Sequence, residues 1–278
     1  MVSKKLKARM GMWLVYCALI IIVLISLFPF AWLVVTSFKT RFLAFAIPPK
    51  WFFEPTFENY QGVYYLSSFP KYYLNSVVIA LSSTALSILI GTPAGYSLAR
   101  FKVRGASLAQ SLILLTRMMP GIGIIIPFYM IWKSTGLLDT HLALIITYLT
   151  FNLSFVIWMT KGFIEEIPKD IEESAVVDGC TSFQVFYKIS LPLVASGLAA
   201  IAIFCLILCW NEFMFALLLT GYTARTVPVG MTEFITHEAI RWGEMAAAGV
   251  STAFPVIIFA LIVQRQLIRG LTFGAVKG

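Results

Sequence analysis

The stretch IPKDIEESAVVDGCTSFQVFYKISLP, Ile167 to Pro192, is a long polar interruption in an otherwise very apolar sequence. Between two predicted helices lies Gly179, the residue type that most easily adopts the left-handed conformation ending a helix. The stretch therefore predicts a helical hairpin between membrane spans, which is typical of a docking surface. Two pairs of residues three positions apart predict capping boxes that start its helices: Asp170 with Glu173, and Thr181 with Gln184.

The composition indicates an integral membrane protein. Of the 278 residues, 59% are hydrophobic and only 12% are charged, and the mean hydropathy is +0.87. A soluble domain of this length could not bury so much apolar surface. The formal net charge of +8 comes from Lys and Arg residues that cluster at the ends of apolar runs. This pattern is expected of a membrane protein and gives no indication of nucleic-acid binding.

Six apolar runs each reach the ~20 residues that a helix needs to cross the hydrocarbon core, so we expect an all-α fold with six transmembrane helices. With the N-terminus inside, nearly twice as many basic residues fall in inner segments as in outer ones. This bias predicts that both termini and the polar hairpin are cytoplasmic. The expected spans lie at about 11–35, 74–99, 108–132, 142–161, 192–219 and 246–263.

The chain is expected to have three parts along the sequence. Residues 1–70 would hold the first span and an outer loop rich in aromatic residues. Residues 71–268 would form the main transmembrane domain, with the polar loop at about 163–192. Residues 269–278 would form a cytoplasmic tail.

The polar hairpin also carries a spaced signature: Glu-Ala-Ala, three residues, Gly, nine residues, then Ile-x-Leu-Pro. The chain matches it with one departure, a serine in place of the first Ala, and thereby resembles the permease subunits of binding-protein-dependent ABC importers. The matching residues are Glu173, Ser174, Ala175, Gly179, Ile189, Leu191 and Pro192. Other segments resemble the carbohydrate branch related to the maltose system: GYSLARFKVRG at 95–105, GLLDT at 136–140, WNEF at 210–213 and the ending at 269–278.

The resemblance implies that the hairpin docks into a cleft on a cytoplasmic ATPase subunit. It implies an assembly in a prokaryotic inner membrane, with a second, different permease subunit, two ATPase subunits and an external substrate-binding protein. An apolar ridge on the second helix would be made by Phe183, Phe186 and Tyr187. The residues expected to couple the chain to the ATPase are Glu173, Ser174, Ala175, Asp178, Gly179, Phe183, Ile189, Leu191 and Pro192.

No catalytic or metal-binding set is apparent in the sequence. The chain has no G-x-x-x-x-G-K-[ST] phosphate-binding loop, so we expect a transport subunit that is not itself an enzyme. It would bind no cofactor, and ATP and Mg²⁺ would be held by the partner ATPase subunits. Cys205 and Cys209 share a helix face but lack the His or acidic partner of a metal site, so they are expected to be free and buried.

Polar residues inside the expected spans are candidates for contact with the solute, because burying them in a membrane is costly. Arg117 either faces the translocation pathway or extends to the interface. Asn152, Asn211 and Glu212, with Trp210 beside them, either bond sugar hydroxyls or join neighbouring helices.

The resemblance assigns two further contacts. An outer loop at 220–245 would touch the docked binding protein, and the tail would touch the ATPase pair. The residues concerned are Val229, Gly230, Met231, Thr232 and Glu233 in the loop, and Gly274, Ala275, Val276 and Lys277 in the tail.

Together these features predict a permease subunit of an ATP-driven importer for a sugar, oligosaccharide or polyol. An importer of an amino acid or a polyamine is the nearest alternative. A stand-alone secondary carrier would need intramembrane acidic groups for coupling ions, and Glu212 is the clear candidate for one. A membrane-embedded enzyme is disfavoured because the spans contain no paired catalytic set.

Overall fold

The computed structural model describes residues 2–102, 104–236 and 240–273, with side chains for 11–102, 104–236 and 240–262. The chain divides into two compact units. The first unit comprises Met1–Phe69 and Glu233–Ala253, and the second comprises Pro70–Thr232 and Phe254–Gly278. Throughout the described residues the regular structure is helical, apart from one isolated β-bridge between Ile235 and Ile240.

Four helices are long and apolar enough to cross a membrane, which confirms the all-helical membrane class. They are α1 (Val2–Ser37), α4 (Phe69–Arg100), α7 (His141–Glu165) and α14 (Trp242–Phe273). Two further candidates are pairs of shorter helices, each bent at a break. α5 (Ala106–Met118) meets α6 (Gly121–Ser134) at 97°, and the segment Ser182–Leu193 meets α11 (Ala195–Asn211) at 74°. The described residues therefore offer four to six spans, depending on how the bent pairs are counted.

A proline lies at one of the two breaks and two residues before the other. Pro120 lies between α5 and α6, and Met119 before it is extended, with φ −67° and ψ 126°, because the proline ring disfavours a helical residue at that position. Pro192 has no N–H to donate to the preceding turn, which disturbs the regular hydrogen-bond pattern there. The chain before it forms a π-helix, η1 (Phe186–Ser190), between the short helices α9 (Ser182–Val185) and α10 (Leu191–Leu193).

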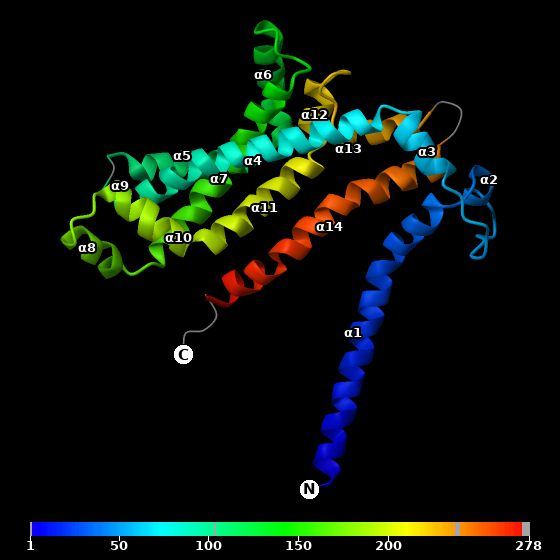
Figure 1. Ribbon diagram of the computed structural model, residues 1–278, viewed down its shortest axis with the longest axis horizontal. Helices are drawn as coiled ribbons and strands as arrows, with labels where there is room; N and C mark the ends of the chain where they lie inside the picture. Colours follow the sequence, from blue (N-terminus) through cyan, green and yellow to red (C-terminus); the bar gives the residue numbers. More distant parts are fainter. Residues whose placement is uncertain (1, 103, 237–239, 274–278) are drawn as a thin grey trace. The chain divides into compact units, whose positions relative to one another are not determined.

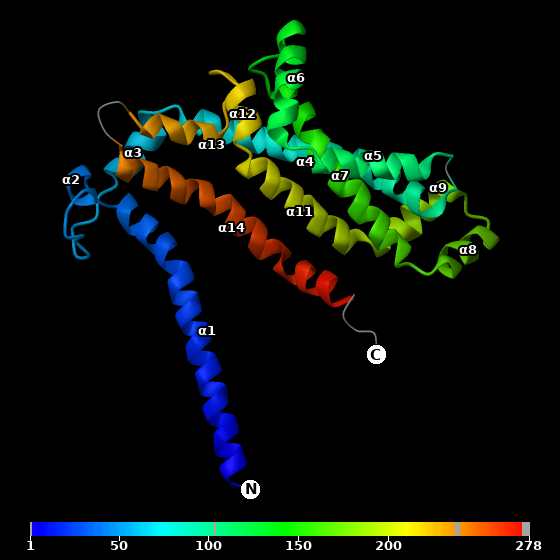
Figure 2. The ribbon, with the colours of Figure 1, turned by 180° about the vertical axis from the view of Figure 1, so that it is seen from behind.

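The core of the second unit lies between α4, α7 and α11. Helix α11 lies beside α7 (Figures 1 and 2), α5 also packs against α7, and buried residues of α4, α7 and α11 share the same clusters. Gly91 and Gly95 on α4 allow it to approach α7 closely, as small residues four positions apart do in membrane helices. A Cβ atom on Gly91 would lie 2.7 Å from the Val156 side chain, and one on Gly95 would lie 2.8 Å from the carbonyl oxygen of Ile157.

Within the first unit, the aromatic loop folds back on the end of α1. Trp51 makes an edge contact with Trp32, with ring centroids 5.1 Å apart. Asn59, on α3 (Glu58–Tyr65), donates hydrogen bonds to the carbonyl oxygens of Ser37 and Lys39 at 2.9 and 2.7 Å. The Lys39 ammonium is buried over the ring of Trp32. The short helix α2 (Arg41–Ala44) follows α1.

The remaining short elements follow α11 in the chain. They are α12 (Met214–Leu219), α13 (Val227–Gly230) and the 3₁₀ helix η2 (Met231–Phe234).

Candidate functional site

The polar stretch forms the expected helical hairpin, defined here as residues 167–193. Its first helix is α8 (Lys169–Val177), and Gly179 adopts φ +88° in the turn, as predicted. Thr181 and Gln184 form a complete capping box at the start of α9, which is also confirmed. The second helix runs on through η1 and α10 and is joined to α11 at a 74° bend.

The predicted capping box of Asp170 and Glu173 is wrong. Helix α8 begins earlier than expected, because Pro168 stands at its N-cap with φ −57° and no side-chain cap is present. Asp170 and Glu172 therefore lie in the first turn, where negative charge suits the helix dipole, and Glu173 lies beyond it.

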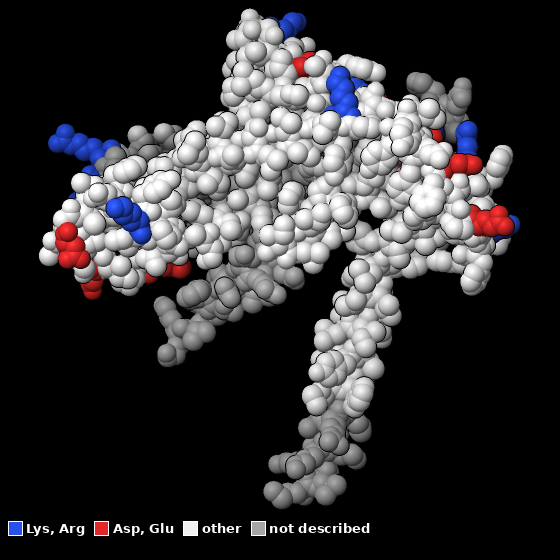
Figure 3. Space-filling model, in the orientation of Figure 1, with Lys and Arg blue, Asp and Glu red and all other residues white. Residues whose placement is uncertain are grey.

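Most of the residues predicted to couple the hairpin to a partner form its accessible surface. Phe183 and Tyr187 stack with ring centroids 5.9 Å apart and are 73% and 60% exposed. The charged side chains of the second unit gather near its ends, including the end that carries α8 and α9 (Figure 3). The exposed residues are Glu173, Ser174, Asp178, Gly179, Phe183, Tyr187 and Pro192, and the half-buried ones are Ile189 and Leu191.

Two residues assigned to this surface lie inside the chain instead. Ala175 is buried and accepts a backbone hydrogen bond from Cys180, so it closes the turn of the hairpin. Phe186 is also buried and lies 4.8 Å from the ring of Tyr96 on α4. The expected three-membered aromatic ridge is therefore wrong for Phe186, since the π-helix turns its side chain toward the core.

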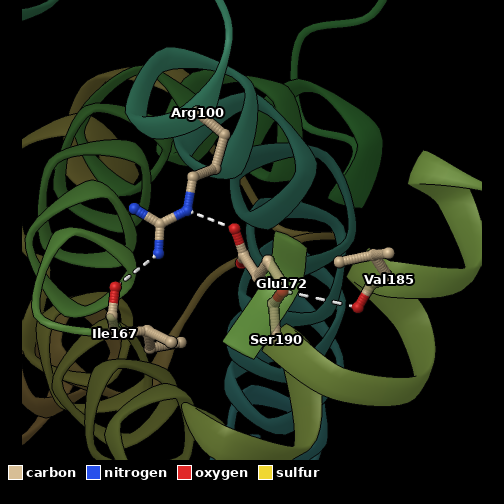
Figure 4. A network of polar contacts seen from close by, with 5 residues as sticks. All are labelled: Arg100, Ile167, Glu172, Val185 and Ser190. Atoms are coloured by element: carbon tan, nitrogen blue, oxygen red, sulfur yellow. Dashed lines mark hydrogen bonds and ion pairs between the residues drawn. The ribbon is translucent and has the colours of Figure 1, made fainter. Parts of the chain in front are cut away.

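A buried network joins the hairpin to α4 and to η1 (Figure 4). The Arg100 Nε atom donates to Glu172 Oε2 at 2.5 Å, and Arg100 Nη2 donates to the carbonyl oxygen of Ile167 at 2.8 Å. Ser190 Oγ donates to Glu172 Oε1 at 2.6 Å. The Arg100 and Glu172 side chains are only 8% and 10% exposed, so water competes little with their ion pair. One carboxylate thus links three elements.

The sequence prediction missed this network. Arg100 was interpreted only as part of a basic cluster at the end of a span, and Glu172 was passed over for its neighbour Glu173. The available signal was the pairing of an arginine at a helix end with a glutamate in a polar segment. A separation of 72 residues hides that pairing in a single sequence.

Most of the candidate pathway residues join helices. Glu212 lies at the break between α11 and α12, where Oε2 accepts from Tyr148 Oη at 2.8 Å and the carboxylate caps the N–H groups of Phe215 and Ala216. Asn152 is buried on α7 and donates to Cys209 Sγ on α11 at 3.0 Å. Trp210 is buried against Tyr73.

Two candidates remain exposed in the described structure. Asn211 is exposed and bonds the Ile207 carbonyl oxygen of its own helix. Arg117 is exposed in the last turn of α5, with its guanidinium 4.8 Å from the centre of the Phe155 ring.

Part of the predicted binding-protein surface is internal. Val229 and Gly230 are buried, and a Cβ atom on Gly230 would lie too close to the Tyr72 ring. Thr232 is exposed, and Met231 and Glu233 are half-buried. The tail residues Gly274, Ala275, Val276 and Lys277 lie outside the described residues.

Asp139 fixes the start of this outer loop, and sequence reasoning missed that role as well. Its carboxylate accepts hydrogen bonds from four successive backbone N–H groups, those of residues 221–224, at 2.8 to 3.1 Å. Burial alone would raise the pKa of Asp139, but the four donors outweigh it and lower the pKa to about 2. The loop that follows α12 is therefore tied to the α6–α7 connection.

Replacing Asp139 with Asn is expected to lower the thermal midpoint at pH 7 by about 4 °C, because hydrogen bonds to a charged acceptor are lost. The folded-state pKa lies below the ordinary value of 3.8, so the stabilisation is present above pH 4 and disappears as the pH falls through about 2. Thermal unfolding of the purified protein between pH 3 and 7 measures this. A difference between the two proteins that does not shrink with acidification would contradict the assignment.

The described residues contain no group of three or more His, Cys, Asp or Glu side chains placed to hold a metal ion. The four cysteines are free, with Cys205 and Cys209 buried and Cys17 and Cys180 more accessible.

Comparison with known proteins identifies relatives along most of the chain. Residues 87–273 match the family described as "Binding-protein-dependent transport system inner membrane component". A probable ABC transporter permease protein of Sinorhizobium fredii is 40% identical, covering 92% of each chain. A trehalose/maltose transport system permease protein of Thermococcus litoralis is 36% identical over 93% of this chain and 94% of its own. The fold matches a bacterial ABC transporter "involved in the import of the acidic polysaccharide alginate", with TM-score 0.78, 23% identity, and coverage of 92% and 96%.

Proposed function

The chain belongs to the family of binding-protein-dependent transport system inner membrane components, and we propose that it lines one half of the solute pathway of a sugar importer. As a permease subunit it is a multi-pass inner-membrane protein without an ATPase domain. ATP and Mg²⁺ would accordingly be bound by two partner ATPase subunits. A second, different permease subunit would complete the pathway, and an external binding protein would deliver the solute.

The proposed solute is a sugar, an oligosaccharide or a polyol. The support is the trehalose/maltose permease of Thermococcus litoralis, which is 36% identical over 93% of this chain. A methionine transporter shares the fold at 18% identity, which carries no information about this chain's solute. Arg117 is the charged candidate that stays exposed within a bent span, and we propose that it borders the pathway.

The hairpin is the proposed docking surface for an ATPase subunit, and the observation that carries this is its exposed aromatic pair. Phe183 and Tyr187 stack on each other and have most of their surface uncovered, with the acidic Glu173 and Asp178 exposed on the same hairpin. Aromatic residues that become buried on association are enriched in protein–protein interfaces. In this arrangement the hairpin and both chain termini would lie in the cytoplasm.

Removing the anchor should uncouple the permease from its ATPase. The double variant Phe183→Ala, Tyr187→Ala is expected to retain about 3% or less of the co-purified ATPase, because hot-spot residues contribute about 2 kcal/mol or more. Tyr65→Ala removes an aromatic ring of similar exposure in the first unit and serves as the control, with ATPase recovery unchanged. Full recovery of ATPase with the double variant, at an unaltered thermal midpoint, would eliminate the docking proposal.

A further inference from the structure

The buried network behind the docking surface has a distinctive geometry. The two oxygens of Glu172 engage different elements, since one accepts from Arg100 on α4 and the other from Ser190 in η1. Arg100 also holds the Ile167 carbonyl oxygen, directly before Pro168. Pro168 is the extended residue at which the chain passes from α7 to α8, so it is the natural place for the hairpin to swing. The hydrogen bond from Arg100 to the Ile167 carbonyl oxygen restrains this connection.

The π-helix extends the connection into the next span. Ser190 Oγ lies 3.4 Å from the Val185 carbonyl oxygen, five residues back, while it donates to Glu172 at 2.6 Å. Single π-helical turns inside longer helices often occur at functional positions. The chain reaches the 74° bend four residues beyond the end of η1, at Val194. A displacement of α8 would therefore act directly on the segment that bends.

We propose that Arg100, Glu172 and Ser190 are positioning residues for transport, which hold α8, the C-terminal end of α4 and the start of the bent span together as one rigid group. Movement of a docked ATPase would then displace α4 and the bent span together with the hairpin. This rests on the proposed docking function and adds the residues that carry the motion onward. Stability alone does not require charges here, because well-packed apolar side chains stabilise such a site equally well.

The decisive measurement is uptake per ATP hydrolysed, in proteoliposomes that contain the permease pair, the ATPase and the binding protein. Glu172→Gln keeps the shape of the side chain and removes its charge. We expect docking to persist and uptake per ATP to fall about tenfold, which lies within the usual range of coupling between sites. Glu165→Gln removes the carboxylate of an exposed pair with Lys161 and should leave the ratio unchanged.

A merely structural role would reduce ATP hydrolysis and uptake in equal proportion, so an unchanged ratio in Glu172→Gln would overturn the proposal. Failure of this proposal is distinguishable from failure of docking, because ATPase recovery with the Phe183 and Tyr187 double variant tests docking separately. A second measurement needs no destabilised variant. Spin labels at Lys102 and Val177, both exposed, should keep the same separation without nucleotide and with ATP. A change in that separation would show that the hairpin moves independently of α4, and would also overturn the proposal.

Discussion

Gly95→Val is expected to abolish the folded permease. A Cβ atom at this position would lie 2.8 Å from the Ile157 carbonyl oxygen, 2.9 Å from the Thr160 side chain and 3.1 Å from the Lys161 backbone nitrogen. Two of these three neighbours are backbone atoms of α7, which cannot move aside without displacing the helix. Overpacking costs about 1–3 kcal/mol where side chains can adjust, and a clash with backbone costs more.

The measurement is the fraction of monodisperse protein in size-exclusion chromatography after detergent extraction, together with its thermal midpoint. Gly162→Ala is the control, because it also adds a Cβ atom to a glycine of a helix, but that atom meets no other atom within 4 Å. It should be neutral or slightly stabilising, since alanine favours a helix over glycine. If Gly95→Val behaves like Gly162→Ala, the close approach of α4 and α7 is not required for folding.

Glu212→Ala is expected to have the second-largest effect, by releasing the joint between α11 and α12. The substitution leaves the N–H groups of Phe215 and Ala216 and the Tyr148 hydroxyl without their acceptor. Each unsatisfied buried polar group costs about 1–3 kcal/mol, so the thermal midpoint should fall by roughly 10 °C. Uptake should fall with it, because the joint lies directly at the end of a bent candidate span.

Three further variants separate the contributions at this joint. Tyr148→Phe removes one donor and should lower the thermal midpoint only slightly. Glu212→Gln keeps an acceptor oxygen, so its thermal midpoint should lie between those of Tyr148→Phe and Glu212→Ala. Asn211→Ala changes the adjacent exposed residue, whose side chain bonds only the Ile207 carbonyl oxygen, and should be close to wild type. Equal midpoints for Glu212→Ala and Asn211→Ala would refute the assigned joint. Retention of coupled uptake in Glu212→Ala would also remove the basis for a secondary carrier that depends on this carboxylate.

The membrane class could be predicted because the length of an apolar run is a local property. Each of the six expected runs corresponds to helical structure in the described residues, and the break in the third run lies at Pro120. The bend angles of 97° and 74° could not be predicted, since they depend on how the shorter helices pack. The turn of the hairpin was also predictable, because glycine and capping chemistry act over three or four residues.

The interior of the site was less accessible to sequence reasoning. Asp170 was expected to cap α8, but the N-cap is Pro168 and the helix begins at Lys169. The inward position of Glu172 was also missed, because it depends on contacts with Arg100 and Ser190. Which side of α8 is buried depends on Arg100, on a helix far away in the chain. Val229 and Gly230 were misassigned for the same reason, since their burial comes from contacts with distant α4.

The adjacent carboxylates of Glu172 and Glu173 have opposite orientations, so they can be substituted for two separate purposes. Glu173 is exposed and Glu172 is buried, so under the proposed docking function substitutions of Glu173 would act on the choice of ATPase subunit, and substitutions of Glu172 would act on the movement of the permease itself. A chimaera could therefore be fitted to a foreign ATPase by exchanging only the outward set, Glu173, Asp178, Phe183 and Tyr187. The inward set would be left intact, and with it the permease's conformational cycle.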